Sequence, residues 1–315
     1  MSKQKHMEEQ QVDAFKVAQF DGHKGAIYTL EQGIEPHLFY SGSDDNLVVE
    51  WNLRNPEKNQ ALVKTPSKAF ALKLIPELNL LLVGNYTGGI HVVDLDQKKE
   101  IKLLQLHNQI IFDIQYLPEK ACFFATSQDG SFSVWSIKDF SLIKANRLSN
   151  GKLRCVDFCI NRNEAAIGCE DGTVRIIELD NYSEVLKIEG HSKGFSVNTA
   201  VYHPYNNTLV TGSRDAHLNI WDVNNQYKLL ERIPAHNFSI YSIAFNSNGS
   251  LFATGSRDKT IKIWDSETTK MLLRIDHKFG GHLKSVNKIM WSDFDDILLS
   301  TGDDRTIKAW KILEK

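Results

Sequence analysis

The sequence has few of the features that mark secreted, membrane or disordered proteins. Its 315 residues include only 4 cysteines, too few for the disulfide framework of a small secreted domain. Only 7 prolines occur, while 42% of the residues are apolar and 24% are charged, so the chain can bury a large core. No apolar run approaches the roughly 20 residues that a membrane-spanning helix needs, and residues 1–11 lack the apolar stretch of a secretory signal. We therefore expect a globular protein with no membrane partner.

The charge balance and the cysteines narrow the class further. The 37 Lys and Arg residues nearly balance the 39 Asp and Glu residues, for a net charge of -2. Because the chain lacks a basic excess, nucleic acid is not expected to be its main ligand. Cys155 and Cys159 lie in one apolar run, and residues four apart on a strand are ~13 Å apart, too far to form a disulfide or share a metal ion. Buried free thiols suit a reducing compartment, so we predict a cytoplasmic protein.

A repeated segment dominates the rest of the sequence. Each copy consists of a small, polar and acidic turn followed by a short alternating strand that ends in Trp or an apolar residue. The seven copies end at Trp51, Val93, Trp135, Ile177, Trp221, Trp264 and Trp310, with spacings of 42, 42, 42, 44, 43 and 46 residues. A histidine precedes five of these ends, by 28 residues in four copies and by 30 in the fifth: His23, His107, His191, His236 and His282. Thr65 and Ser149 stand in the histidine place of the second and fourth copies.

Each repeat contains four short strand-like runs separated by turn residues, which predicts a four-stranded antiparallel sheet. A period near 43 with Gly-His and Trp-Asp landmarks resembles the WD-repeat family of β-propellers. The resemblance implies an all-β fold, a seven-bladed propeller of four-stranded antiparallel blades. The last repeat lacks its fourth strand, and the run at residues 14–20 should complete it and close the ring. We expect residues 1–12 to be a flexible polar extension and residues 13–315 to form one propeller domain.

In this family, His, Ser or Thr, Asp and Trp form a buried hydrogen-bonded set within a blade. The resemblance assigns the following sets: His23, Ser41, Asp45 and Trp51; His191, Thr211, Asp215 and Trp221; His236, Thr254, Asp258 and Trp264; His282, Ser300, Asp304 and Trp310. A set that recurs at one blade position is structural, because an enzyme needs a single site. We expect blade 2 to be held mainly by apolar packing, since Thr65, Thr87 and Val93 fill its His, Asp and Trp places.

The sequence shows no phosphate-binding glycine loop, no zinc-ligand spacing and no nucleophile with its own base. We therefore predict that the protein is not an enzyme, has no catalytic residues, and holds neither a cofactor nor a metal.

Propellers of this family bind at the end built by the loops that enter each inner strand, which we call the top face. By resemblance, the third and fifth residues after the histidine and the residue before the turn Asp point to this face. This register predicts a partner-binding face of Tyr28, Asp44, Lys68, Phe70, Tyr86, Ile110, Phe112, Gln128, Lys152, Arg154, Glu170, Arg214, Tyr241, Arg257 and Asp303. The same register also assigns Ala26, Ser196, Asn198, Ser239, Ser285 and Asn287 to it.

In this set, an apolar cluster falls on blades 1–3, made of Tyr28, Phe70, Tyr86, Ile110 and Phe112. A group of cations falls on blades 4–6, with Tyr241 beside them: Lys152, Arg154, Arg214 and Arg257. Aromatic residues and Arg are enriched at binding hot spots. We therefore predict a non-catalytic scaffold, monomeric on its own, that binds a protein or peptide with an apolar anchor and an acidic group. Two alternatives remain open: a reader of a modified peptide, with aromatic rings caging a methylated ammonium, and a substrate-receptor subunit of a larger complex such as a ubiquitin ligase. The second rests on Trp51-Asn52-Leu53-Arg54, an imperfect match to a Trp-Asp-x-Arg motif.

Overall fold

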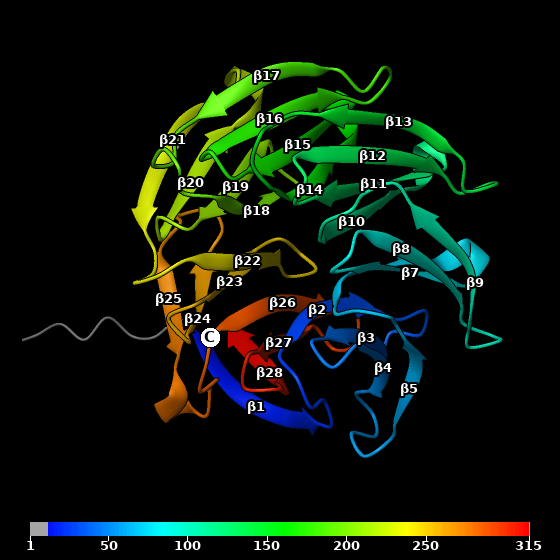
Figure 1. The fold of residues 1–315 in the computed structure, drawn as a ribbon. Helices are drawn as coiled ribbons and strands as arrows, with labels where there is room; N and C mark the ends of the chain where they lie inside the picture. Colours follow the sequence, from blue (N-terminus) through cyan, green and yellow to red (C-terminus); the bar gives the residue numbers. More distant parts are fainter. Residues whose placement is uncertain (1–11, 315) are drawn as a thin grey trace, which may run out of the picture.

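Residues 12–314 are described by a computed structural model, in which 28 strands form seven antiparallel sheets of four strands each. The sheets are arranged as blades around a central channel (Figure 1). This confirms the all-β seven-bladed propeller. Within each of blades 1–6 the four strands are consecutive in the sequence, so neighbouring strands are joined by short turns.

In each blade, the first strand lines the channel and the other three follow outwards. Blades 1 and 2 contain β2 (Ile27–Gln32), β3 (Leu38–Ser43), β4 (Leu47–Asn52) and β5 (Asn59–Lys64), then β6 (Ala69–Ile75), β7 (Leu80–Asn85), β8 (Gly89–Asp94) and β9 (Lys99–Gln105). Blades 3 and 4 contain β10 (Ile111–Leu117), β11 (Cys122–Ser127), β12 (Ser131–Ser136) and β13 (Leu142–Arg147), then β14 (Leu153–Cys159), β15 (Glu164–Cys169), β16 (Thr173–Glu178) and β17 (Glu184–Glu189).

Blades 5 and 6 contain β18 (Val197–Tyr202), β19 (Thr208–Ser213), β20 (His217–Asp222) and β21 (Lys228–Pro234), then β22 (Ile240–Phe245), β23 (Leu251–Ser256), β24 (Ile261–Asp265) and β25 (Met271–Ile275). Blade 7 contains β26 (Val286–Ser292), β27 (Ile297–Gly302), β28 (Thr306–Glu314) and β1 (Val12–Asp21). The helices are single 3-10 turns: η1 (Pro76–Leu78), η2 (Pro118–Lys120), η3 (Ile160–Arg162), η4 (Val223–Asn225) and η5 (His277–Phe279).

The hydrophobic core lies between neighbouring blades. Between blades 2 and 3, for example, Leu82 and Val92 belong to the same buried cluster as Phe123 and Ile114. Because successive side chains of a strand point to opposite faces of its sheet, a strand in the middle of a blade packs against both neighbouring blades. A single blade therefore cannot bury its apolar residues alone, and the stability of the fold depends on a closed ring.

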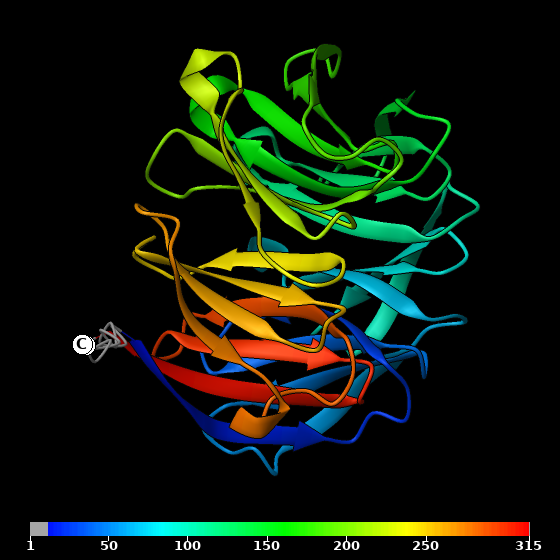
Figure 2. The same cartoon turned by 90° about the vertical axis from the view of Figure 1, so that its left-hand side faces the viewer.

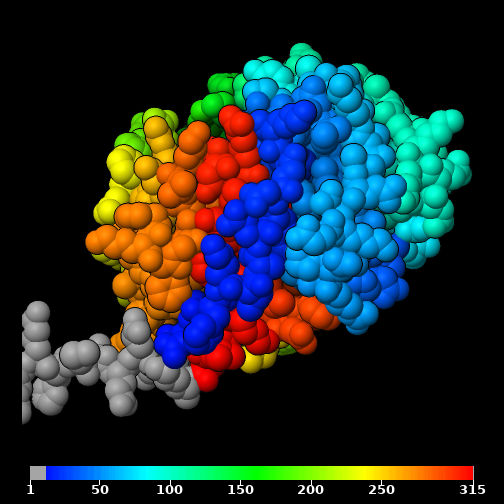
Figure 3. Space-filling view, turned by 90° about the horizontal axis from the view of Figure 1, so that it is seen from below, coloured from blue at the N-terminus to red at the C-terminus, as the bar shows by residue number. Residues whose placement is uncertain are grey.

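The ring is closed by pairing the two ends of the described chain. β1 runs antiparallel to β28, from Val12 opposite Glu314 to Asp21 opposite Thr306, and Figures 2 and 3 show the blue N-terminal strand beside the red C-terminal strand. Phe20 on β1 is buried. The predicted closure is thus confirmed. Val12, which the expected boundary placed in the extension, already belongs to β1; residues 1–11 of that extension lie outside the described residues.

Candidate binding face

Each of the four predicted structural sets forms a buried hydrogen-bonded network inside its blade, in blades 1, 5, 6 and 7. We call this network of His, Ser or Thr, Asp and Trp the lock. In blade 6, His236 Nδ1 lies 2.9 Å from Asp258 Oδ2, and its Nε2 lies 2.7 Å from Thr254 Oγ1. Trp264 Nε1 donates to the same hydroxyl at 2.9 Å. Burial lowers the pKa of His236, although Asp258 opposes this. Since the carboxylate only accepts, the neutral imidazole donates through Nδ1 and accepts the hydroxyl proton at Nε2.

The same contacts recur in the other three blades. The His Nδ1 to Asp distances are 2.9 Å in blade 1, 3.3 Å in blade 5 and 2.9 Å in blade 7. The Trp Nε1 to hydroxyl distances are 2.7, 2.9 and 3.1 Å. In blade 5, the glycine before the histidine makes room for the indole ring, because a Cβ on Gly190 would lie 2.1 Å from Cη2 of Trp221.

Blades 2, 3 and 4 build the lock from other side chains. In blade 3, the hydroxyl comes from Ser133 on β12, which lies 2.9 Å from His107 Nε2 and accepts from Trp135 Nε1 at 2.8 Å. In blade 4, which has no histidine at this place, Arg175 on β16 donates to Asp171 at 3.2 Å and to Glu184 at 3.0 Å.

Blade 2 contains a buried polar network that the sequence did not predict. The buried His91 on β8 lies 2.8 Å from Asn85 Nδ2 and 2.9 Å from Glu100 Oε2. The prediction that apolar packing mainly holds blade 2 was therefore incomplete, because a second polar network occupies its centre. The sequence does carry a signal: His91, Ser133 and Arg175 all stand four residues after the turn Asp place of their repeat.

The predicted face residues come together at one end of the propeller. In every blade, the residue before the turn Asp place donates its backbone N–H to the carbonyl of the residue three after the histidine place. In blade 5, after its insertion, the acceptor is Ser196. The seven donor–acceptor pairs are Asp44–Ala26, Tyr86–Lys68, Gln128–Ile110, Glu170–Lys152, Arg214–Ser196, Arg257–Ser239 and Asp303–Ser285, at 2.8 to 3.0 Å. The loops that enter the inner strands and the turns between the second and third strands therefore form a single surface, the top face.

Exposure on this face is uneven. Tyr86, Arg214 and Arg257 are exposed, and the other twelve residues of the predicted binding face are half-buried, so none belongs to the buried core. Ser196, Asn198 and Ser239, which the same register assigned to the face, are buried. Their side chains are turned inwards; Asn198 Nδ2, for example, donates to the carbonyl of Ile240 in the next blade at 2.8 Å.

An aromatic cluster crosses blades 1 to 3. The rings of Tyr28 and Phe70 stack with centroids 4.3 Å apart and an interplanar angle of 5°. Phe112 meets Phe70 edge-on at 6.2 Å, and Tyr86, which is 48% exposed, lies 6.2 Å from Phe70 on another side. Stacked and edge-on pairs are favourable geometries, so the four rings pack together as one aromatic cluster on the top face.

Two of the face cations already have acidic partners. Lys68 pairs with Asp44 at 2.5 Å, and Lys152 pairs with Glu170 at 3.2 Å. Arg154, Arg214 and Arg257, in contrast, form no ion pair with any residue of the described range.

Each of these three arginines lies over a phenylalanine ring. The Cζ-to-centroid distances are 4.0 Å for Arg154 and Phe112, 5.9 Å for Arg214 and Phe195, and 6.0 Å for Arg257 and Phe238. Phe195 and Phe238 are 43% and 57% exposed. Exposed aromatic rings outside the predicted face residues thus accompany the arginines of blades 5 and 6, so the aromatic surface extends beyond blades 1–3. Both phenylalanines lie outside the three positions per repeat that the sequence assigned to the top face.

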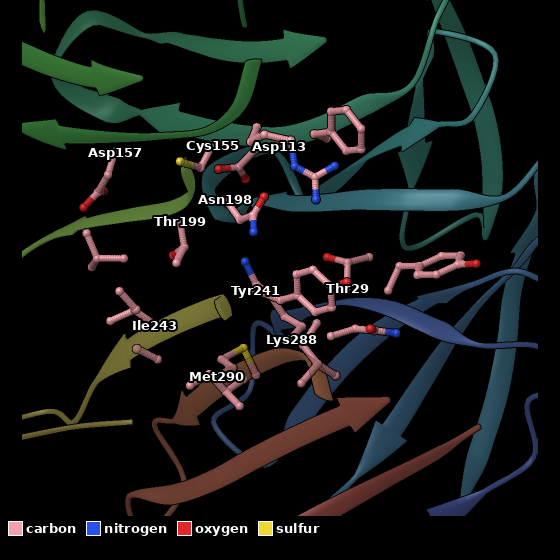
Figure 4. Close-up of a pocket in the computed structure, with 18 of the residues that line it drawn as sticks. Thr29, Asp113, Cys155, Asp157, Asn198, Thr199, Tyr241, Ile243, Lys288 and Met290 are labelled. Carbon is pink, nitrogen blue, oxygen red and sulfur yellow. The ribbon is translucent and has the colours of Figure 1, made fainter. Parts of the chain in front are cut away.

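The top face opens into the central channel, which forms a cavity of about 550 Å³. The inner strands of all seven blades line it, and face residues such as Tyr28, Phe112 and Arg154 form part of the lining. Figure 4 shows Asn198, Tyr241 and Lys288 among the side chains that surround this space. A channel of this size accommodates an inserted side chain of a partner.

No group of three or more His, Cys, Asp or Glu side chains within residues 12–314 could hold a metal ion. None of the helices in this range has the length and apolar character required to cross a bilayer. The Trp51–Arg54 segment ends at Arg54, whose guanidinium lies 5.4 Å from the ring centroid of Phe294.

Comparison with known proteins agrees with the repeat and the fold. The family model "WD domain, G-beta repeat" matches residues 15–52, 182–222, 227–265 and 274–311. The crystal structure of the WD40 β-propeller domain of Doa1 superimposes with a TM-score of 0.83 at 16% identity, covering 95% of this chain and 97% of that one. The chain is therefore a WD-repeat protein whose repeats close into a seven-bladed β-propeller.

Curated relatives are more distant in sequence. The WD repeat domain-containing protein 83 homolog of Dictyostelium discoideum is 22% identical over 233 residues, which cover 64% of this chain and 70% of the relative. Pre-mRNA-processing factor 19 of Bos taurus is 24% identical over 168 residues, and the match spans only 33% of that protein.

Proposed function

We propose that this protein is a non-catalytic scaffold that binds a protein or peptide partner on the top face of the propeller. The observation that carries the proposal is the aromatic cluster of Tyr28, Phe70, Tyr86 and Phe112, which is assembled and partly exposed at the channel mouth. The rigid rings provide large contact area at a low cost in conformational entropy, which is why such residues dominate binding hot spots.

The charges on the same face favour a partner with an acidic group. Arg214 and Arg257 are exposed, have no acidic partner within the described residues, and lie beside Phe195 and Phe238. A partner that places apolar side chains on the rings and a carboxylate or phosphate near the arginines would satisfy both features. Charge-assisted bonds of this kind are stronger than neutral hydrogen bonds.

The modified-peptide reader is less well supported. A cage for a methylated ammonium needs separated rings around an open space, whereas Tyr28 and Phe70 stack at 4.3 Å and Arg154 already covers the Phe112 ring at 4.0 Å. A role as the substrate-receptor subunit of a larger complex is compatible with the same face. Its motif residue Arg54, however, lies over Phe294 rather than among the top-face residues.

We further propose that the propeller is monomeric on its own and resides in the cytoplasm. The four cysteines are free, and three of them are buried, which is compatible with a reducing compartment.

The proposal is tested by affinity capture from cell extract with the full chain and the double variant Tyr86→Ala, Arg257→Ala. Both side chains are exposed, so we expect the melting temperature to change by less than about 2 °C while partner capture falls at least tenfold. The matched control is Val185→Ala, Leu230→Ala, which removes two exposed side chains from the outer strands β17 and β21 and should leave capture unchanged. Equal capture by the two double variants would contradict binding at the top face.

A further inference from the structure

The channel mouth contains a cation that has no acidic partner within the described residues. Arg154 on β14 lines the cavity. Its Nε atom is inaccessible to solvent and, within the described residues, has no hydrogen-bond partner. The nearby carboxylate of Glu170 is engaged by Lys152 at 3.2 Å and by the Lys152 backbone N–H at 3.1 Å. Arg154 is half-buried, and withdrawing part of a charge from water without a partner is costly, so this arrangement favours a ligand that supplies an anion.

Other charged side chains in or beside the channel have partners within the described residues, unlike Arg154. Lys73 pairs with Glu31 at 3.1 Å. Asp113 and Asp157 accept backbone N–H groups of the next blade, at 3.0 Å from Val156 and 2.8 Å from Tyr202. These acids therefore have partners on neighbouring inner strands, while Arg154 has none. Lys288 also lines the cavity and forms no ion pair among residues 12–314, so Arg154 and Lys288 are the cations of the lining that lack a carboxylate partner within this range.

The Arg154 guanidinium packs against an aromatic ring. It lies 4.0 Å from the centroid of the Phe112 ring, which supports one planar face of the group by cation–π attraction. Tyr241, whose hydroxyl makes no hydrogen bond within the described chain, lines the same cavity. The planar guanidinium carries its N–H groups as a fork, the geometry that binds a carboxylate or phosphate through two bonds.

We propose that Arg154 and Tyr241 form an anion-binding subsite at the channel mouth, which takes one acidic side chain of the bound peptide. The proposal rests on the proposed function and deepens it, because it assigns the buried anchor point of the partner. Two sources supply the required chemistry, the carboxylate of Asp or Glu and the phosphate of a phosphorylated residue. The adjoining rings of Tyr28, Phe70 and Phe112 would cover the apolar neighbours of that side chain.

The test uses three small probes and the Nε–H signal of Arg154 in the NMR spectrum of the full chain. The probes are the N-acetyl, N-methylamide derivatives of glutamate, phosphoserine and glutamine. We expect a saturable shift with a millimolar dissociation constant for glutamate or phosphoserine and no shift for neutral glutamine. The stronger of the two anions identifies the source. In Arg154→Gln, the shifts of the Tyr241 ring signals should be lost, whereas Arg214→Gln, which removes an arginine outside the cavity lining, should keep them.

The subsite is ruled out by the absence of a saturable shift with both anions, by an equal shift with glutamine, or by persistence of the Tyr241 shifts in Arg154→Gln. Melting curves verify that both variants are folded. Partner capture separates this outcome from a failure of the proposed function. If Arg154→Gln captures the partner normally while Tyr86→Ala, Arg257→Ala does not, the top face binds the partner but the subsite does not contribute.

Discussion

Blades 1, 5, 6 and 7 differ from blades 2, 3 and 4 in how their centres are held together. The first group contains the complete His, Ser or Thr, Asp and Trp lock. The segments that match the WD40 family model fall on these four blades, except where one of them includes β17 of blade 4. The second group uses substitutes, namely Ser133 in blade 3, Arg175 in blade 4 and His91 with Asn85 in blade 2. All seven sheets nevertheless have four antiparallel strands.

This difference shows that the blade needs a satisfied polar network at its centre rather than one particular set of residues. It also bears on binding, because blades 2, 3 and 4 contribute Phe70, Tyr86, Phe112 and Arg154 to the top face. The blades that depart most from the repeat thus supply much of the candidate binding surface, while the regular blades contribute the exposed Arg214 and Arg257.

The largest effect is expected from deleting residues 1–20. The lock of blade 7 lies on β26 to β28 and the loops around them, and would remain intact, but the ring would lose buried residues of β1 such as Val12, Ala14 and Phe20. We expect a loss comparable with the stability of a whole domain, about 5–15 kcal/mol, measured by chemical unfolding and proteolysis. A truncated chain that melts like the full chain would show that locked blades do not need closure.

Replacing the central histidines tests whether the substitute network of blade 2 contributes to stability. His236→Leu leaves Asp258 and Thr254 without their partner and should cost about 3 kcal/mol. His91→Leu should cost about 1–2 kcal/mol, since Glu100 is more exposed than Asp258. If blade 2 relied on apolar packing alone, His91→Leu would be neutral or stabilising in urea unfolding. The exposed His277→Leu is the control and should change stability by less than about 0.5 kcal/mol.

The contributions of Asp129 in the lock of blade 3 and of Asp157 in the channel to the unfolding free energy should change with pH in opposite directions. Burial by itself would raise the pKa of Asp129, but hydrogen bonds from His107 and Ser131 outweigh it and lower the pKa to about 2. Burial raises the pKa of Asp157 in the channel to about 6; Asp113 adds to this rise, while Lys73 and backbone N–H groups oppose it. The ordinary value for both groups is 3.8.

The lock of blade 3 therefore contributes stability above pH 4 that is lost as the pH falls towards 2, by about 2 kcal/mol. Asp157 acts in the other direction: its contribution is complete below pH 3.8 and is lost as the pH rises to about 6, by up to about 3 kcal/mol. Unfolding free energies of Asp129→Asn and Asp157→Asn across this range should each lack one of the two slopes. Identical pH profiles for the wild type and both variants would contradict these assignments.

The smallest effect concerns the turns between the second and third strands. The residue after the turn Asp place has a left-handed backbone conformation, with positive φ, in all seven blades. It is glycine in blades 2, 3 and 4 but Ala216, with φ of 67°, in blade 5. Since a Cβ is unfavourable at this φ, Ala216→Gly should stabilise the protein, by less than about 1 kcal/mol. Destabilisation in the same unfolding assay would show that the alanine methyl group contributes packing that outweighs the strain.

The repeat spacing is sufficient to predict the blades, the number of strands and the closing strand, because they depend on periodic patterns that tertiary context does not alter. The hydrogen-bonded sets of blades 1, 5, 6 and 7 use residues that the same spacing identifies. The substitutes His91, Ser133 and Arg175 were missed because a side chain on a neighbouring strand of the blade can make an equivalent hydrogen bond at its centre. Phe195 and Phe238 were missed because loop residues outside the three chosen positions also reach the face. The stacking of Tyr28 on Phe70 depends on distances between blades, which one repeat does not encode.

Hydrogen exchange of the full chain, free and bound to its captured partner, tests the central claim most directly. Binding at the top face predicts slower exchange in the turns that hold Tyr86, Gln128 and Glu170 and in the loops that precede β6, β10 and β14. Exchange along the outer strands β13 and β17, which carry exposed Leu142 and Val185, should stay unchanged. Protection confined to those outer strands, with the turns of the top face exchanging as in the free protein, would contradict the account.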